Sequence, residues 1–183
     1  MFHPVDLTLQ QIVEDPESSS VERSVDPDGN PAFIFSKKSG VSRLAYGLLD
    51  SPFHRNFALL FRLMAANDTG MLFALTDKSQ MRIQLGVKLT RGKLTGRQVA
   101  VYYSDSKGKT YGKARFAPVA YFPLPTENHV WTRFAISFSA NKISFFHNCN
   151  REPMVGTFSR SNAPQLVEAG AAIMVGQGGH LCL

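Results

Sequence analysis

The chain has 183 residues, of which 44% are hydrophobic and 19% charged, and its formal net charge is +6. This length predicts one domain, and the apolar content excludes wholesale disorder. No run approaches the roughly 18 consecutive apolar residues of a membrane span. The first twenty residues also lack the basic start and apolar run of a secretory signal. We therefore expect no membrane insertion.

The predicted elements begin with one short helix over residues 6–13. Asp6 is the expected N-cap, and the leucine, isoleucine and valine residues that follow offer a small apolar face. Pro16 ends the helix. The stretch Asp26–Ala32 is rich in Asp, Gly, Asn and Pro, which predicts a turn.

From Phe57 onward the hydrophobic pattern has a period of two, which is typical of strands. We predict strands over residues 57–63, 70–77, 81–89, 98–105, 110–118 and 170–179. The segment Met81–Leu89 is the clearest of them, because every second residue is apolar. Strands joined by short polar turns, with no long helical pattern, predict an all-β antiparallel sandwich.

The stretch Trp131–Cys149 predicts a hairpin with a turn at Ser139–Lys142. Phe134, Ile136 and Phe138 fall on one face of its first strand. On the second strand one face takes Ile143, Phe145, His147 and Cys149. A slip of one residue would expose this whole set, so the register is expected to be firmly specified. Trp131 is expected to cover the end of the core.

Charge is distributed unevenly along the chain. Residues 1–30 carry seven acids and one base, whereas residues 78–115 carry ten bases and one acid. Such a block indicates a polyanionic partner, although a solvated sheet face is the plain alternative. The candidate polyanion-binding residues are Arg82, Lys88, Arg91, Lys93, Arg97, Lys107, Lys109, Lys113 and Arg115. Nucleic acid is not the expected polyanion, because the aromatic residues here follow the core pattern and form no stacking platform.

An ordered set of motifs resembles the thrombospondin-N-terminal-like domains, most of all those of the collagen XV/XVIII type. These motifs are VDLTLQQIV, DPDGNPAF, FALLFRLMAANDTGMLFALTD, MRIQLGVKL and HVWTRFAISFSANKISFFHNC. The resemblance covers about residues 5–179. It implies a laminin-G-like, concanavalin-like jelly-roll sandwich formed by residues 1–183 as a single domain. It also implies a secreted matrix protein, although this chain contains no signal peptide.

Two departures from the family pattern lead to further expectations. The family continues past its Gly-rich turn into a last strand, whereas this sequence stops at Leu183, so we expect a domain truncated at that strand. The loss would expose the edge of a neighbouring strand and lower stability. The family pairs the cysteine at the Cys149 position with a later one, and Cys182 is the available partner, although it lies earlier than the family pattern requires. A disulfide between Cys149 and Cys182 and a lost partner therefore both stay open.

The remaining candidates are weaker. Asn67 begins an Asn-Asp-Thr glycosylation acceptor in a predicted turn. His147 and Cys149 have no visible acid orienter for catalysis, and two residues are too few for a metal. Asp68 and Asp77 are weak calcium candidates. We therefore expect no metal, no cofactor and no enzyme.

The sequence thus predicts a non-catalytic matrix domain for adhesion or matrix organisation. The resemblance and the basic block together imply heparan sulfate or heparin as partner, and other matrix proteins are possible further partners. A lectin-like or glycosidase jelly roll is one alternative, because jelly rolls also carry these activities. A purely structural domain of a collagen-like chain is the other.

Overall fold

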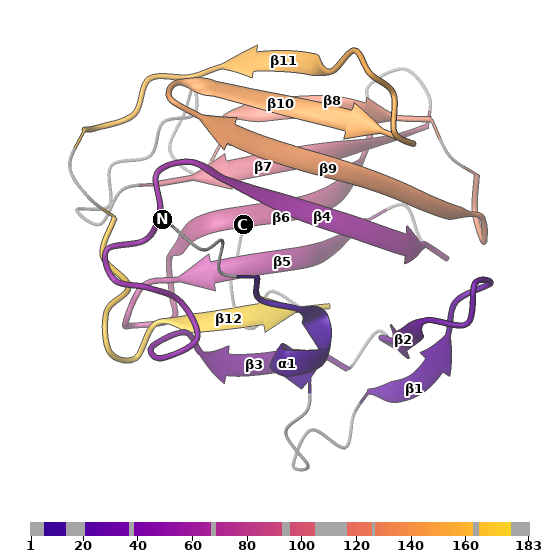
Figure 1. Ribbon diagram of the computed structural model, residues 1–183, viewed down its shortest axis with the longest axis horizontal. Helices are drawn as coiled ribbons and strands as arrows, with labels where there is room; N and C mark the ends of the chain where they lie inside the picture. The colour runs from indigo at the N-terminus through magenta and orange to yellow at the C-terminus, as the bar shows by residue number, and fades with distance from the viewer. Residues whose placement is uncertain are drawn as a thin grey trace.

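The computed structural model describes residues 6–13, 21–36, 39–66, 69–92, 96–104, 117–125, 127–162 and 165–176. Two antiparallel sheets pack face to face in it (Figure 1). The front sheet has the strand order β11-β10-β9-β4, and the back sheet has the order β3-β12-β5-β6-β7-β8. A separate hairpin, β1–β2, lies beside them. The all-β sandwich with one short helix, predicted from the sequence, is confirmed.

The described elements have the following bounds in chain order. They are α1 (Leu9–Val13), β1 (Glu22–Val25), β2 (Pro31–Ile34), β3 (Val41–Leu44), β4 (Phe57–Met64), β5 (Gly70–Thr76), β6 (Ile83–Arg91), β7 (Arg97–Tyr103), β8 (Ala120–Leu124), β9 (Trp131–Ser139), β10 (Lys142–His147), β11 (Met154–Thr157) and β12 (Ala172–Val175). No helix in this described part of the chain has the length and apolar character to cross a membrane.

The core lies between the two sheets and is rich in phenylalanine. Phe145 of β10 stacks on Phe134 of the same sheet, with ring centroids 5.2 Å apart, and on Phe122 of the opposite sheet at 5.0 Å. Leu85, Val99 and other back-sheet side chains meet these rings and are almost completely buried. Stacked rings at these distances add to the gain from burying their area.

The predicted hairpin forms with the expected register. Ile143 pairs with Phe138, and Phe145 pairs with Ile136, so the apolar sets of β9 and β10 lie on the same inner face. All four of these side chains are buried. The turn sits at the predicted position, where Ala140 adopts a φ of 47°. Trp131, at the start of β9, is half-buried, and the Arg62 guanidinium lies 5.8 Å from its ring centroid.

Two local predictions are wrong. Asp6 does not cap α1, because the cap is a reciprocal pair. The Gln11 N–H donates to Thr8 Oγ1 at 3.3 Å, and the Thr8 N–H donates to Gln11 Oε1 at 2.8 Å. Met81 is also not part of a strand. It lies in the β5–β6 turn with 81% of its surface exposed, and β6 begins two residues later.

The β1–β2 hairpin is held against β4 by a charged cluster. Asp26 Oδ1 accepts the N–H groups of Asp28 and Asn30, both at 2.9 Å. Arg62 of β4 contacts Asp26 at 2.8 Å and Asp28 at 2.7 Å. Burial of the Asp26 carboxyl opposes ionisation, but the hydrogen bonds from Asn30 and Asp28 and the Arg62 charge outweigh it. The pKa of Asp26 is therefore lowered from its ordinary value of 3.8.

This cluster predicts a loss of stability in acid. Because the pKa of Asp26 is lower in the folded state, its contribution is complete above the unfolded value and disappears as pH falls through the folded value. Urea unfolding at pH 5 and at pH 3 should therefore show a smaller acid loss for Asp26→Asn than for the unmodified chain. Equal acid losses in the two proteins would contradict this role.

Candidate polyanion-binding surface

The outer face of β6, β7 and β8 is the part of the predicted basic surface that the structure describes. Lys88 pairs with Ala100, and Ala100 pairs with Tyr121, so these residues form one row across the three strands. Their neighbours along the strands, Val87, Val99 and Phe122, point into the core. The row therefore lies on the side of the back sheet away from the core, which is turned away from the viewer in Figure 1. On it Ala100 is buried, Lys88 half-buried and Tyr121 exposed.

Positive charge and a tyrosine hydroxyl coincide on this outer face at Lys88 and Tyr102, whereas Arg91 ends β6 in line with Leu89 on the other side of the sheet, where it pairs with Arg97. The described strands β6, β7 and β8 contain no aspartate or glutamate, whereas they carry Lys88, Arg91 and Arg97. Lys88 is half-buried and Arg91 is exposed. Tyr102 stands on the same face, where it pairs across from Gly86. Burial and the neighbouring Tyr121 raise the pKa of Tyr102, which keeps its hydroxyl neutral and able to donate at physiological pH.

Glycine is required at position 86 of this face. A Cβ built there would lie 2.9 Å from Ile83 Cγ2 and 3.5 Å from Tyr102 Cβ. The short distance is the one to Ile83, so the glycine leaves room for the Ile83 side chain, whereas the distance to Tyr102 is an ordinary van der Waals contact.

Arg97 does not belong to this surface, and here the structure corrects the sequence prediction. Only 4% of Arg97 is exposed. Its guanidinium donates to the carbonyls of Glu127 at 3.1 Å and Ala65 at 3.2 Å, and to Asn128 Oδ1. Arg97 therefore joins the loops at the ends of β4 and β8. Its guanidinium is directed to partners within the protein and not to the surface.

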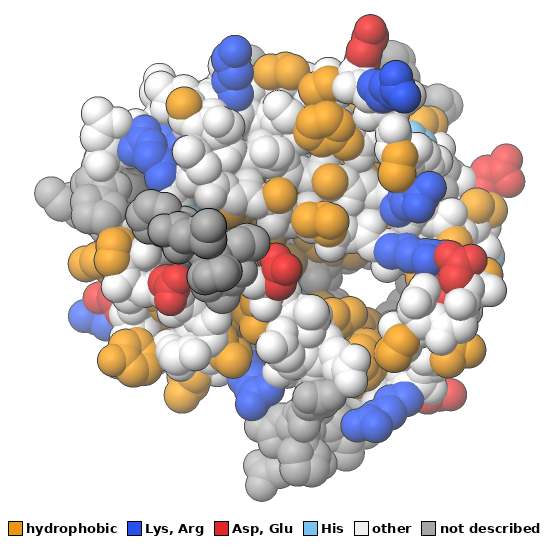
Figure 2. Space-filling view, viewed as in Figure 1, with side chains coloured by type: hydrophobic (Ala, Val, Ile, Leu, Met, Phe, Trp, Pro, Cys, Tyr) orange, Lys and Arg blue, Asp and Glu red, His pale blue; other side chains and the backbone are white. Residues whose placement is uncertain are grey.

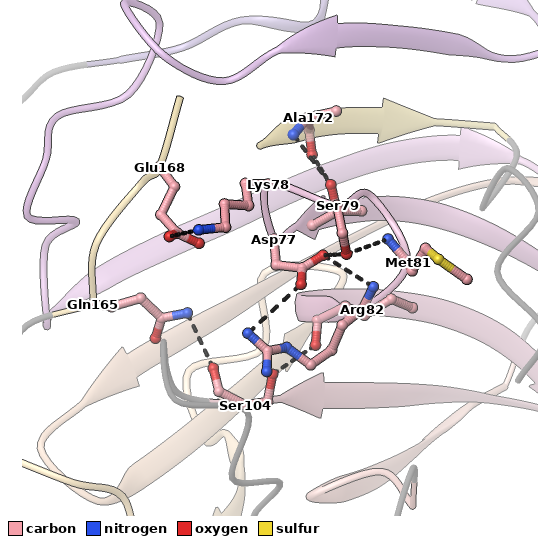
Figure 3. A network of polar contacts seen from close by, with 11 residues as sticks. Asp77, Lys78, Ser79, Met81, Arg82, Ser104, Gln165, Glu168 and Ala172 are labelled. Atoms are coloured by element: carbon pink, nitrogen blue, oxygen red, sulfur yellow. Dashed lines mark hydrogen bonds and ion pairs between the residues drawn. The ribbon is translucent and has the colours of Figure 1, made fainter. Parts of the chain in front are cut away.

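Arg82 is also held in an internal network rather than presented on the outer face (Figure 3). Its Nη2 lies 3.7 Å from Asp77 Oδ2, and its backbone N–H donates to Asp77 Oδ1 at 3.2 Å. Ser79 Oγ also donates to Asp77, at 2.8 Å. Next to them, Lys78 pairs with Glu168 at 3.4 Å. The network fixes the β5–β6 turn against the segment before β12, so it stabilises the fold and adds little free positive charge.

Several predicted site residues lie outside the described residues. These are Lys93, Lys107, Lys109, Lys113, Arg115, Asn67, Asp68 and Cys182. Their roles in polyanion binding, glycosylation, calcium binding and disulfide formation stay predictions. The two basic connections follow the ends of described strands. β6 ends at Arg91, before the connection with Lys93, and β7 ends at Tyr103, at the opposite end of the sheet, before the connection with Lys107.

Cys149 does not continue the face of β10, contrary to the sequence prediction. β10 ends at His147, and Asn148 and Cys149 follow in a turn with φ values of 46° and 61°. Cys149 is exposed as a free thiol, whereas His147 is half-buried with its Nε2 3.2 Å from Thr132 Oγ1. Among the described residues, no three His, Cys, Asp or Glu side chains gather as a metal site.

Sequence reasoning missed the tyrosines of the outer face. Tyr121 lies on β8, a five-residue strand that contains Pro123 and was not predicted. Tyr102 was passed over because only its neighbours Val101 and Tyr103 matched the apolar alternation. A tyrosine on the polar side of a predicted strand was the available signal.

Comparisons with known proteins were made against this geometry. No protein-family model matches the chain. A segment of the human collagen alpha-1(XVIII) chain is 30% identical over 176 residues, which is 93% of this chain and 10% of the collagen. The chain thus spans about a tenth of the length of this relative.

Two solved structures share the fold at low sequence identity. Domain 4 of AbnA, an extracellular GH43 arabinanase from Geobacillus stearothermophilus solved with arabinotriose, has a TM-score of 0.51. It is 14% identical, and the match covers 89% of this chain and 69% of that one. Tailspike protein 2 of the Escherichia coli O157:H7 bacteriophage CAB120 has a TM-score of 0.53 at 11% identity, covering 86% and 22%. These likenesses show the sandwich fold, and the collagen XVIII match confirms the predicted resemblance to the laminin-G-like domains of the collagen XV/XVIII type.

Proposed function

We propose that this chain is a non-catalytic domain of a secreted matrix protein that binds heparan sulfate and related sulfated glycans. The similarity to collagen XVIII supports the extracellular setting and makes other matrix proteins further candidate partners. One observation carries the ligand class: the three neighbouring strands carry Lys88 and Arg91, and their described residues include no carboxylate. Sulfated glycans are bound chiefly through positive electrostatic fields, with release of counterions.

The proposed ligand lies along the strands of this face. The two basic connections leave the sheet at opposite ends, separated by the seven residues of β7, or about 24 Å of strand. Lys88 lies between them, with the side chains of Tyr102 and Tyr121 on the same face. A short glycan reaches only one end, whereas a long one reaches both. Affinity is therefore expected to rise steeply once the oligosaccharide is long enough to span the strand.

A heparin column tests this proposal. The double variant Lys88→Glu and Arg91→Glu should elute at clearly lower salt than the unmodified chain, because Lys88 on the outer face and Arg91 at the exposed end of β6 both change from positive to negative. The matched control is Lys142→Glu with Arg151→Glu, since both residues are exposed and belong to the front-sheet side, where Lys142 begins β10 and Arg151 lies between β10 and β11. The control pair should elute close to the unmodified chain. Equal decreases in eluting salt for both pairs would show that only the net charge determines retention, and the proposed site would then be rejected.

The same experiment separates the alternatives. The arabinanase domain was solved with arabinotriose, so an array of neutral glycans is the relevant comparison. Binding there, with affinity independent of salt, would favour a lectin-like domain over the polyanion site. Turnover of any glycan would favour the glycosidase alternative. Absence of binding to heparin and to neutral glycans would favour a structural domain.

A further inference from the structure

The free edge of β4 differs from the other sheet edges of the described structure. β4 pairs with β9 on one side only, and it stands last in the front sheet. It is eight residues long, whereas the edge strands β3 and β11 have four residues each, and β8 has five and includes Pro123. Short edges and proline are common means of preventing further pairing. β4 carries neither, so its outer row of backbone groups is suited to accept a strand.

The core is open along this edge. The inward side chains of β4, namely Phe57, Leu59, Phe61 and Leu63, are all only half-buried. Their partners on β9 across the register are far better covered, with Phe134, Ile136 and Phe138 at most 4% exposed. Both strands face the same core, so the difference comes from the missing neighbour beyond β4. A further strand there would bury these four side chains.

The back sheet extends beneath the position of such a strand, and its side chains there form what we call the floor. The back sheet has six strands, whereas the front sheet has four. In Figure 1, β5 and β12 of the back sheet lie between β4 and the helix α1. The helix α1 packs against β3. Phe73 of β5 points to this side and is half-buried. Figure 2 shows the surface hollowed below β4, beside the β1–β2 hairpin, with hydrophobic side chains in the hollow. The space is therefore apolar at its base and bounded on both sides.

We propose that the free edge of β4 binds an extended peptide segment of another polypeptide, which adds to the front sheet as a fifth strand. The segment has apolar residues at every second position, facing Leu59, Phe61 and the floor, and polar residues at the others, facing solvent. Main-chain hydrogen bonds to β4 hold it, and the alternating side chains select it.

A single extended peptide fits this edge better than a second copy of the folded chain. Eight residues of strand are about 27 Å long, and a strip about 10 Å deep offers roughly 270 Å². A standard interface needs about 800 Å² from each partner. A second sandwich would also meet the projecting strands of the back sheet, α1 and the hairpin. An isolated strand passes between these elements.

Hydrogen exchange tests the proposal. The probe is an eight-residue peptide with Val, Leu and Phe alternating with Lys and Thr, titrated into the purified chain. Exchange of amides within residues 57–64 should slow by tenfold or more at saturation. A peptide of the same composition with its apolar residues grouped together should bind at least tenfold more weakly. N-methylation of alternate residues along the pairing edge of the peptide should abolish binding. This test changes only the peptide, so its result does not depend on whether a protein variant folds.

Two substitutions on the same strand add a matched control. Leu59→Lys places a charge on the inward side and should lower peptide affinity at least tenfold. Leu60→Lys changes a side chain that is 79% exposed on the outer side and should leave affinity within twofold. Protection confined to β3, β8 or β11 would overturn the proposal. So would unchanged affinity for the N-methylated peptide, or protection of β4 that appears on self-association without any peptide.

Discussion

Replacing Phe145 with alanine is expected to lower the free energy of unfolding by about 4 kcal/mol, the largest loss from any single core residue in this account. Phe145 is 1% exposed, and its ring lies between Phe134 of its own sheet and Phe122 of the opposite sheet. Its removal leaves a cavity where the two sheets meet and also takes away two ring contacts. Urea denaturation followed by tryptophan fluorescence measures the change, since Trp131 begins the neighbouring strand.

Phe146→Ala is the matched control, because the two residues are adjacent and belong to the same strand. Phe146 points to the outer face of the front sheet and is half-buried. Its replacement is expected to cost about 1 kcal/mol. If the two substitutions were equally destabilising, the register assigned to β9 and β10 would be wrong.

Arg97→Met is expected to destabilise the domain by about 3 kcal/mol or more. The substitution keeps an apolar stem of similar length but removes the donors to Ala65, Glu127 and Asn128. Their acceptor oxygens would then have to find water or remain unpaired at the ends of β4 and β8. Thermal and urea unfolding measure the effect.

Arg91→Met provides the comparison for this prediction. Arg91 pairs with Arg97 across β6 and β7, but it is exposed. Its replacement should change stability by less than about 0.5 kcal/mol, as is usual for surface sites, while lowering heparin retention. A stable Arg97→Met protein with weakened heparin binding would show that Arg97 acts at the surface after all.

The fold could be predicted from the sequence where strands are long and one face is buried. β4, β6 and β9 have eight or nine residues, so alternation of apolar and polar side chains repeats often enough to be read. The β9–β10 hairpin joins a nine-residue strand to a six-residue strand through Ala140 and Asn141, and its register followed directly. The ordered motifs also indicated a resemblance to the collagen XV/XVIII type, and the collagen XVIII match confirmed that resemblance.

Short elements were not predictable in the same way. β1, β3 and β11 have four residues each, too few for a period to emerge. Their strand character comes from pairing with other strands, and in the case of β3 the partner, β12, is distant in sequence. The cap of α1 was misplaced for a different reason. Asp6 and Thr8 are both good cap residues, and only the reciprocal contact with Gln11 selects Thr8.

The candidate site was predictable in its charge and not in its burial. The excess of lysine and arginine in residues 78–115 is visible in the sequence alone. Which of these cations reach solvent depends on partners far along the chain. Arg97 meets carbonyls about thirty residues away on either side, and Arg82 meets Asp77 across a turn. Lys88 remains on the outer face because its position alternates with buried Val87 and Leu89.

The central claim, that the outer face of β6–β8 binds sulfated glycans, is tested most directly by hydrogen exchange with and without a heparan sulfate oligosaccharide long enough to span β7. If this face binds the glycan, amide exchange should slow within residues 83–91 and 97–103, and the effect should be lost as salt is raised. Slower exchange confined to the front sheet, or none anywhere at saturating glycan, would contradict it.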